Sequence, residues 1–403
     1  MIDTYKDATY NLDIKDWLLG DFVMLAMGMI RGKAGVHLID IKKPEIEQED
    51  EVMVRVKEVG VDGTDLTLVK HQLQDIEEAS DSIVLGHEMV GIVEEVGRRV
   101  KSLSPGDIVV VTVRRGCDIC QPCLHNQSDM CMTGLYTERG LHKRNGFLSQ
   151  FVVDKEQYIT KVPDGLERLA IFTEPLSICE KAVEQIRIIQ SRLPWACPHP
   201  EHKFDSRQWG TCKTALVVGA GSLGLLAAAL LRLSGVLTFL ADIVPEDSLK
   251  VHMVEDIGAN YINASNKKPK ELVEICCSVT GNLDIILEAA GAAATAVELI
   301  NYMSRSSIYV MTGIPREKIS IKLDAAQMVR QIVRYNQVIV GSVNSNRRHF
   351  EMAIRDIPDI NLKFTNIMNE MITHCFPIRD YNKAFELDDK NHIKTVIEVE
   401  PWK

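Results

Sequence analysis

Short apolar runs closed by turn residues fill the first part of the chain. Val52–Val56 alternates loosely between apolar and polar residues, Gly91–Gly97 ends in glycine, and Ile108–Val111 is a run of β-branched residues. Such runs between turns predict β-strands. We therefore expect a barrel-like or sandwich domain from Phe22 to about Asp107, with a further strand at Gln150–Val153.

The second half of the chain alternates apolar runs with longer helical patterns. Thr214–Val218 precedes a helical run at Leu225–Leu231, and later apolar runs end at polar or glycine residues. These later runs are Leu237–Ala241, Leu283–Glu288, Ser307–Met311 and Gln337–Gly341. The alternation predicts a doubly wound parallel sheet, which binds ligands at the carboxyl ends of its strands. From about Arg347 the pattern is mixed and ends in a strand at Thr395–Val399, which we expect to return to the first domain.

A chain of 403 residues is too long for one core, so we predict two domains in an α/β fold. We place an N-terminal extension of unassigned purpose at residues 1–21, a discontinuous β-rich domain at 22–188 and 347–403, and the doubly wound domain at 189–346. An insertion runs from Pro194 to Cys212. Its Cys197, His199, His202 and Cys212 lack a standard metal-ligand spacing, so a surface loop is preferred over a metal site.

Charge and composition exclude several classes of partner. The net charge of −10 argues against non-specific binding to nucleic acids or anionic membranes. No apolar run is long enough to span a bilayer. The start of the chain carries Asp3, Asp7, Asp13 and Asp16 and lacks the basic and apolar regions of a signal peptide. With ten cysteines, the chain is expected in a reducing cytoplasm, where clustered cysteines favour metal binding over disulfides.

Four of the cysteines have the spacing of a zinc site. Cys117, Cys120 and Cys123 are separated by two-residue gaps, and Cys131 follows after seven further residues. Short gaps let successive sulfurs surround one tetrahedral ion, and four thiolates leave no open position for water. We predict a structural zinc in a lobe at about residues 114–134, with free thiols or an iron–sulfur cluster as the alternatives. Beyond the lobe, Tyr136–Gly140 is turn-like.

A glycine-rich turn joins the first strand of the doubly wound domain to its helix. Gly219 allows the tight turn, Gly221 lets the backbone approach a pyrophosphate, and Gly224 lets the helix pack on the strand. The next strand ends at Asp242, whose carboxylate can bind both ribose hydroxyls and repels a 2′-phosphate. This pattern predicts NAD in preference to NADP, and the alternative is a plain aspartate at a strand end.

Carboxylates and an imidazole follow short valine-rich runs of the first domain. Asp62 and Asp65 lie in one turn, His87 and Glu88 in another, and Glu174 lies at the start of a helix. Together these residue types can hold a divalent metal. Taken singly, each has an ordinary alternative: turn residues for the aspartates, a satisfied histidine, and a helix cap for Glu174.

Taken together, the motifs resemble the medium-chain zinc-dependent dehydrogenases, and within them the glucose dehydrogenase branch. The resemblance covers nearly the whole chain beyond the first 20 or so residues. It is carried by Val61–Asp65, Leu85–Glu88, Val113–Cys117, Glu138–Gly140, Glu174–Leu176 and Gly341–Asn344. It implies a GroES-like catalytic domain and a Rossmann domain, with a catalytic zinc in the cleft between them.

The resemblance also implies roles for individual residues. The catalytic zinc ligands would be Asp62, His87 and Glu174, with Glu88 as a near or alternating ligand. Thr64 would relay the proton, and Thr64, Glu138, Glu174 and Asn344 would contact the sugar. The cofactor would be lined by Gly219, Gly221, Ser222, Leu223, Gly224, Asp242, Thr312, Gly313, Ile314, Ser342, Val343, Asn344 and Lys394.

The implied activity is oxidation of a sugar hydroxyl, such as that of glucose, to the lactone with hydride transfer to NAD(P). Val113, Ile178 and Arg334 stand where some sugar-binding members have other side chains, which leaves glucose itself open. The alternatives are a zinc-dependent polyol, amino-alcohol or other alcohol dehydrogenase and, more distantly, a non-catalytic NAD-binding redox sensor. The family usually forms homodimers or homotetramers through an edge strand, and Val338–Val343 suits either an edge or a buried strand.

Overall fold

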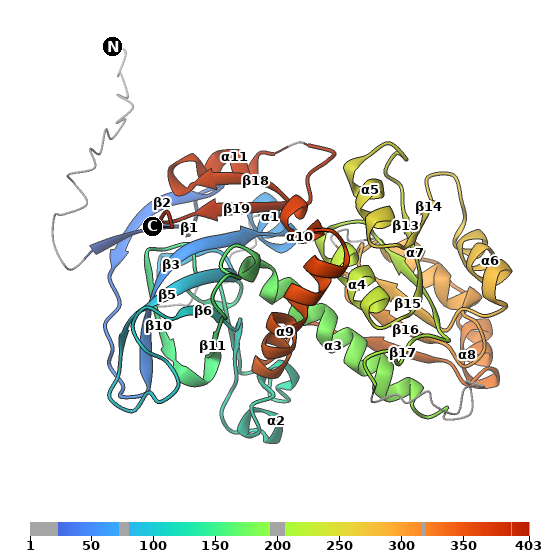
Figure 1. Ribbon diagram of the computed structural model, residues 1–403, viewed down its shortest axis with the longest axis horizontal. Coiled ribbons are helices and arrows are strands. Elements are labelled where there is room, and N and C mark those ends of the chain that lie inside the picture. Colours follow the sequence, from blue (N-terminus) through green and yellow to red (C-terminus); the bar gives the residue numbers. More distant parts are fainter. Residues whose placement is uncertain (1–22, 72–79, 194–205, 316–318, 388, 403) are drawn as a thin grey trace, which may run out of the picture.

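The computed structural model describes residues 23–71, 80–193, 206–315, 319–387 and 389–402. The extension predicted at 1–21 lies outside these ranges, as do Cys197, His199 and His202 of the insertion. The described chain forms two halves that lie side by side, with helices α3 (Thr173–Gln190) and α9 (Arg347–Lys363) between them (Figure 1). No helix in the described part of the chain is long and apolar enough to cross a membrane.

The first half is built on a seven-stranded sheet with the order β11-β6-β5-β3-β19-β18, in which β10 also pairs with β3. Its strands are β3 (Glu51–Val61), β5 (Glu88–Val96), β6 (Ile108–Val111), β10 (Phe151–Lys155), β11 (Ile159–Lys161), β18 (Ile372–Pro377) and β19 (Lys394–Glu398). The antiparallel pairing of β19 with β3 brings the C-terminal segment back to the first half. A small sheet of β1 (Val23–Ile30), β2 (His37–Lys42) and β4 (Ser82–Val84) shares its apolar core.

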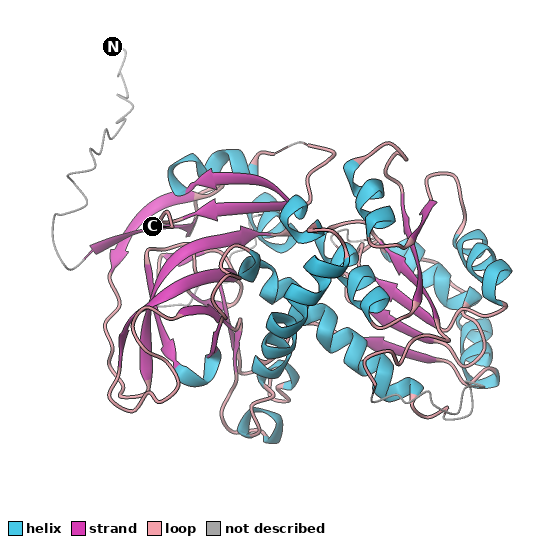
Figure 2. Cartoon of the chain, viewed as in Figure 1, coloured by secondary structure: helices cyan, strands magenta, loops and turns pink. Residues whose placement is uncertain are grey.

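The second half is a six-stranded parallel sheet with the order β14-β13-β12-β15-β16-β17. The strands are β12 (Thr214–Val218), β13 (Leu237–Asp242), β14 (Asn260–Asn263), β15 (Ile285–Glu288), β16 (Ile308–Met311) and β17 (Val338–Gly341). Along β12, Ala215 and Val217 pack into one apolar cluster while Leu216 and Val218 pack into another. Helices therefore cover both faces of the sheet (Figure 2).

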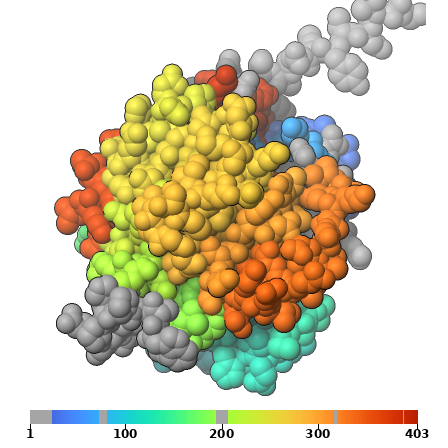
Figure 3. Space-filling model, turned by 90° about the vertical axis from the view of Figure 1, so that its right-hand side faces the viewer, coloured from blue at the N-terminus to red at the C-terminus, as the bar shows by residue number. Residues whose placement is uncertain are grey.

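Five helices follow these strands: α4 (Ser222–Leu233), α5 (Leu249–Asp256), α6 (Pro269–Thr280), α7 (Ala293–Leu299) and α8 (Ala325–Arg334). In the space-filling view, elements from α5 to α8 form a continuous face with the cysteine lobe, in teal, at its lower border (Figure 3). Strand β17 is the last strand of the sheet and its side chains are only half-buried. It is therefore an edge strand, which decides between the two interpretations of Val338–Val343.

The interpretation of Tyr136–Gly140 as a turn was wrong. Thr137–Arg139 forms strand β8, which pairs with β7 (Arg114–Arg115) and β9 (Lys143–Arg144). A strand this polar can form because partners from other elements neutralise its charges: Glu138 pairs with Arg114, and Arg139 pairs with Asp154. Such long-range pairing has no periodic signal in the local sequence.

Helices α3 and α9 pack against each other at the junction of the two halves. One apolar cluster contains Phe172 and Leu176 near the start of α3, Phe350 of α9, and β12 and α4 of the parallel sheet. The residues that hold Glu174 at the start of α3 thus belong to the largest core of the molecule. The remaining α-helices in the described part of the chain are α1 (Gly63–His71), α2 (Gln121–Leu124), α10 (Ile367–Met371) and α11 (Tyr381–Phe385).

Candidate active site and zinc sites

Asp62 is fixed by the helix that follows it. Its Oδ1 accepts hydrogen bonds from the backbone amides of Thr64, at 2.6 Å, and Asp65, at 3.0 Å, and Asp65 Oδ2 accepts one from the Asp62 amide at 3.2 Å. This reciprocal cap satisfies amides that the first turn of α1 leaves without partners. The cap holds Asp62 with its second oxygen, Oδ2, facing His87.

His87 lies between the two aspartates of this cap. Its Nε2 is 3.7 Å from Asp62 Oδ2 and its Nδ1 is 3.5 Å from Asp65 Oδ1. His87 Nδ1 and Asp65 Oδ1 are buried without a hydrogen-bond partner. Asp65 thus faces one ring nitrogen at ion-pair distance while the other nitrogen faces Asp62, and a slightly closer approach of Asp65 would give the arrangement in which a carboxylate steadies a metal-binding imidazole.

The cluster is closed by Glu174, the second residue of α3, which is only 8% exposed. Ligand atoms of Asp62, Asp65 and His87 lie within 4.8 Å of one another, as do those of His87, Glu88 and Glu174. Two ligands about 2.1 Å from one tetrahedral zinc lie roughly 3.4 Å apart. His87 belongs to both groups, whereas Asp62 and Glu174 each belong to only one, so the predicted zinc ligands Asp62, His87 and Glu174 gather around His87, and their binding of one shared zinc ion stays a prediction.

Burial and mutual repulsion give the cluster unusual protonation. Burial, together with the nearby Asp62, Asp65 and Glu138, raises the pKa of Glu174 to about 7. Burial disfavours the charged forms of Asp62 and His87, but their attraction lowers the pKa of Asp62 and, with Asp65, raises that of His87. Concentrated negative charge of this kind is stabilised by a divalent cation.

Glu88 is engaged by a partner other than these ligands. Its Oε2 forms an ion pair with Lys394 Nζ, and both side chains are almost fully buried. Burial lowers the pKa of Lys394 to about 8, opposed by Asp62 and Asp65. The sequence predicted Lys394 as a cofactor contact, and the structure places its ammonium group in the acidic cluster, against the proposed alternating ligand.

Two of the four residues predicted to contact the sugar, Glu138 and Asn344, form a second polar group. Asn344 Nδ2 donates to Glu138 Oε1 at 2.6 Å, and Arg114 Nε donates to the same oxygen at 3.0 Å. Thr64 is exposed, and its hydroxyl donates to Asp62 Oδ2 at 3.0 Å. The structure thus joins β8 of the first half to the loop after β17 of the second, and it connects Asp62 to solvent through Thr64.

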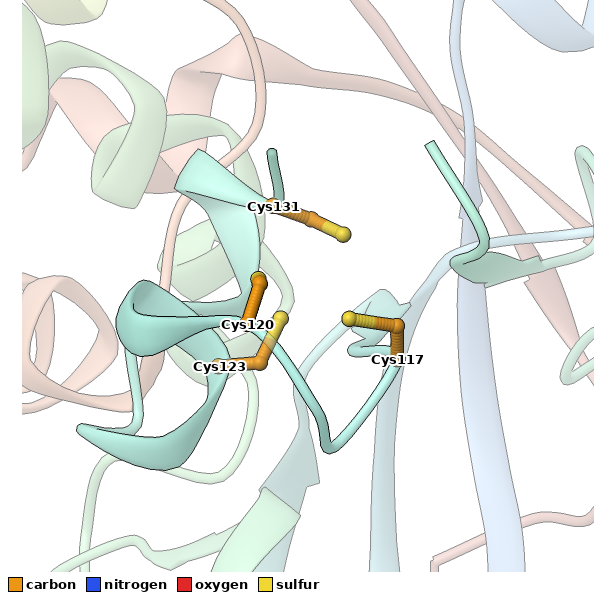
Figure 4. Close-up of side chains that lie close together, drawn as sticks. All are labelled: Cys117, Cys120, Cys123 and Cys131. Carbon is orange, nitrogen blue, oxygen red and sulfur yellow. The ribbon is translucent and has the colours of Figure 1, made fainter. Parts of the chain in front are cut away.

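The four cysteines of the lobe converge as their spacing predicts. Their sulfur atoms all lie within 4.8 Å of one another, and tetrahedral zinc thiolates are roughly 3.8 Å apart. Figure 4 shows Cys117, Cys123 and Cys131 extending toward a shared space, with Cys120 beside Cys123. A hydrogen bond with Thr133 lowers the pKa of Cys117 to about 6, whereas burial raises that of Cys123 to about 12. The residues fit a closed four-thiolate zinc site.

The predicted cofactor residues lie at the carboxyl edge of the parallel sheet. Gly219, with φ of +106°, makes the turn after β12, and a side chain at Gly224 would collide with the Gly219 carbonyl. The hydroxyls of Ser222 and Ser342, after β12 and β17, are buried without a hydrogen-bond partner. A dinucleotide fits this edge, because the backbone amides at the start of α4 can bind a pyrophosphate and the two serine hydroxyls are free to form hydrogen bonds. Thr312, Gly313 and Ile314 follow β16 at the same edge, as do Val343 and Asn344 after β17.

Sequence reasoning missed three residues that support the site. Asp65 was seen only as part of a motif, although its position three residues after Asp62 is the spacing of a reciprocal helix cap. Arg114, which holds Glu138, and Asp129, an acid among the lobe cysteines, carried no local signal. Their partners are distant in sequence, so only the fold reveals their contacts.

Comparison with known proteins assigns the class. Residues 48–164 match the model described as alcohol dehydrogenase GroES-like domain, and residues 167–399 match glucose dehydrogenase C-terminus. With a parallel sheet and two groups of residues that could hold a metal ion, these matches define a zinc-dependent medium-chain dehydrogenase.

Individual relatives narrow the assignment. Glucose 1-dehydrogenase of Methanocella arvoryzae is 32% identical over 368 residues, covering 91% of this chain and 97% of that relative. Glucose 1-dehydrogenase 2 of Vulcanisaeta moutnovskia is 32% identical over 380 residues, covering 93% and 99%. The solved structure of Haloferax mediterranei glucose dehydrogenase in complex with NADP, Zn and gluconolactone aligns with a TM-score of 0.80 at 30% identity, covering 94% of this chain and all of that one. The chain belongs to the glucose dehydrogenase family, which confirms the predicted family and fold class.

Proposed function

We propose that the protein oxidises the anomeric hydroxyl of an aldose such as glucose to the lactone, with hydride transfer to NAD(P). The observation that carries this proposal is that two groups lie near each other, close enough for Glu138 to raise the pKa of Glu174. One is the acidic cluster of Asp62, His87 and Glu174, and the other is the Glu138–Asn344 pair. The names of the relatives, and the NADP, Zn and gluconolactone bound by the Haloferax protein, support the same activity.

The polar pair suits a hydroxylated substrate. Glu138 is a hydrogen-bond acceptor for sugar hydroxyls, and the Asn344 amide can both donate and accept. Their mutual hydrogen bond keeps both groups satisfied until hydroxyls take its place. A simple alcohol gains no hydrogen bonds from this pair, so the pair favours substrates that carry several hydroxyls.

Asp62, Glu174 and Thr64 would handle charge and protons during the reaction. A zinc ion held by Asp62, His87 and Glu174 supplies Lewis acidity to the reacting hydroxyl, and NAD(P) accepts the hydride. Asp62 is held ionised by His87 and the α1 amides, so it can accept a hydrogen bond from the exposed Thr64 hydroxyl. This contact provides a path by which the substrate proton reaches solvent.

We propose NAD as the preferred cofactor. Asp242 ends β13 and its carboxylate accepts backbone hydrogen bonds from Ala220 and Ile243. The neighbouring Ile243 is 72% exposed, so the position beside the ribose carries no cation for a 2′-phosphate. Asp242→Ala should lower kcat/KM with NAD about tenfold while leaving kcat/KM with NADP unchanged or higher. Equal losses with both cofactors would contradict this role.

The test of the proposed activity is NAD(P)H formation with D-glucose, D-galactose, D-xylose, polyols and simple alcohols. Oxidation of an aldose with release of its lactone supports the proposal. Turnover only of polyols, amino alcohols or simple alcohols would replace the substrate and keep the reaction type. NAD binding with no turnover of any of them would favour the redox-sensor alternative.

We further propose that the protein is a homodimer, or a tetramer of such dimers, that forms through β17. The edge strand has unpaired backbone groups on one side, and the neighbouring segments expose Ile314, Val329, Val333 and Val343. Sedimentation of the purified protein tests this proposal, and a monomer at micromolar concentration would contradict it. A cytoplasmic location, which suits the reduced thiolates of the lobe, stays part of the proposal.

A further inference from the structure

Asp129 links the cysteine lobe to the sugar-binding pair. It lies between Cys123 and Cys131 in a short 3-10 turn (Ser128–Met130) and is only 5% exposed. An acid beside four thiolates adds negative charge to the lobe, so its burial there requires compensation from elsewhere. The compensation comes from α3 and from the loop that precedes α9, at the junction of the two halves.

The carboxylate of Asp129 has two buried partners. Its Oδ2 is 2.7 Å from Lys181 Nζ on α3, and its Oδ1 accepts a hydrogen bond from Asn346 Nδ2 at 2.9 Å. Lys181 in turn donates to the carbonyl oxygen of Val343 at 3.0 Å. Asp129 therefore holds the loop after β17 at two points, directly at Asn346 and through Lys181 at Val343.

Asn344 lies between these two anchors. Its backbone has φ of +60°, a left-handed conformation that asparagine adopts more readily than most other non-glycine residues. Its Oδ1 accepts from the Ser345 amide at 2.7 Å, which leaves Nδ2 to donate to Glu138. The orientation of this amide is thus set by a short segment that is fixed on both sides.

Glu138 is tied to the same aspartate. Arg114 Nη1 donates to the backbone carbonyl of Asp129 at 2.9 Å, while its Nε and Nη2 contact Glu138 Oε1. Both members of the sugar-binding pair are therefore held by groups that converge on Asp129.

We propose that Asp129 is a positioning residue for sugar binding, so that the cysteine lobe sets the geometry of Asn344 in addition to holding its own zinc. This inference rests on the proposed aldose oxidation. It gives the cysteine lobe an effect on substrate affinity. The sequence does not suggest this effect, because the lobe lies far from Asn344 along the chain.

The test compares Asp129→Asn with Asp118→Asn. Both changes remove one negative charge from the same lobe, but Asp118 is exposed, and asparagine also accepts its φ of +57°. In Asp129→Asn, the KM for the aldose that the wild type oxidises best should rise about tenfold, equivalent to about 1.4 kcal/mol. Its kcat should change less, and two zinc ions per chain should be retained. Asp118→Asn should behave as the wild type.

A double-mutant cycle separates positioning from a general loss of stability. Because the Asp129 carboxylate acts through the loop that carries Asn344, Asp129→Asn should add no further loss of kcat/KM to Asn344→Ala. Additive losses, or an unchanged aldose KM in Asp129→Asn with both zincs present, would overturn the proposal. If Asp129→Asn does not fold, Asn346→Asp serves instead, since aspartate also caps α9 but cannot donate to Asp129. The same rise in aldose KM is then expected.

Hydrogen exchange tests, without substrate, whether Asp129 holds the loop after β17. Amide exchange across residues 342–346 should quicken in Asp129→Asn and not in Asp118→Asn, and unchanged exchange would show that Asp129 does not hold the loop. A wild type that oxidises no aldose would refute the proposed function while this exchange comparison still decides the inference. An active wild type with an unaffected Asp129→Asn would refute the inference alone.

Discussion

The two groups of side chains that we propose as zinc ligands differ in how the chain builds them. The cysteine lobe takes four identical ligands from one short segment between Cys117 and Cys131. The acidic cluster takes Asp62, His87 and Glu174 from three separate elements, and each is held by further contacts such as the α1 cap and Asp65. A closed site can thus be encoded locally, whereas a site with an open position depends on the packing of the whole fold.

The largest effect is expected from His87→Ala. Loss of the central nitrogen should remove the zinc of the acidic cluster and lower kcat/KM about 10⁴-fold, equivalent to about 5 kcal/mol of transition-state stabilisation. Zinc content should fall from two ions per chain to one, measured by elemental analysis alongside the 340 nm assay. Full activity with this variant would contradict the zinc assignment.

Cys123→Ser is expected to affect stability more than activity, the reverse of His87→Ala. This buried ligand closes the lobe, so its loss should release the structural zinc and lower the free energy of unfolding by about 4 kcal/mol. Thermal or denaturant unfolding with zinc analysis measures this change. A variant that loses its activity but keeps its stability would reverse the roles given to the two sites.

Acidification should weaken zinc binding at the acidic cluster. Without metal, Glu174 with its pKa of about 7 stays protonated below neutrality, and His87 with its raised pKa keeps its proton. Zinc must displace both protons, so its affinity falls as the pH decreases, by about 100-fold or more between pH 8 and pH 6. Competition with a chelator, using Cys123→Ser to isolate this site, measures the change. Equal affinity at the two pH values would show that these groups bind no zinc.

A smaller effect is expected from Asp65→Asn. The amide keeps the size of the side chain but removes the charge that orients His87, so zinc affinity at this cluster should fall about tenfold to 100-fold. The structural zinc should be unaffected, which chelator competition with Cys123 intact reports, because both zinc ions are then present. A larger loss at the lobe than at the cluster would contradict the contact between Asp65 and His87.

The sequence predicted the architecture because its strongest signals are local. The glycine turn from Gly219 to Gly224, the strands on either side of it and the cysteine spacing each lie within one short segment. What it did not predict depends on contacts between distant segments. Strand β8 forms only because Arg114 pairs with Glu138, and Lys394 meets Glu88 only because β19 returns to β3.

The most direct test of zinc-dependent sugar oxidation is the dependence of aldose oxidation on zinc occupancy of the acidic cluster. The protein would be stripped to one zinc per chain by brief chelation and then titrated with zinc, with NAD(P)H formation measured at each step. We expect activity to be lost with the first zinc removed and to return in proportion as one equivalent is restored. Undiminished aldose oxidation by the one-zinc protein would contradict the account.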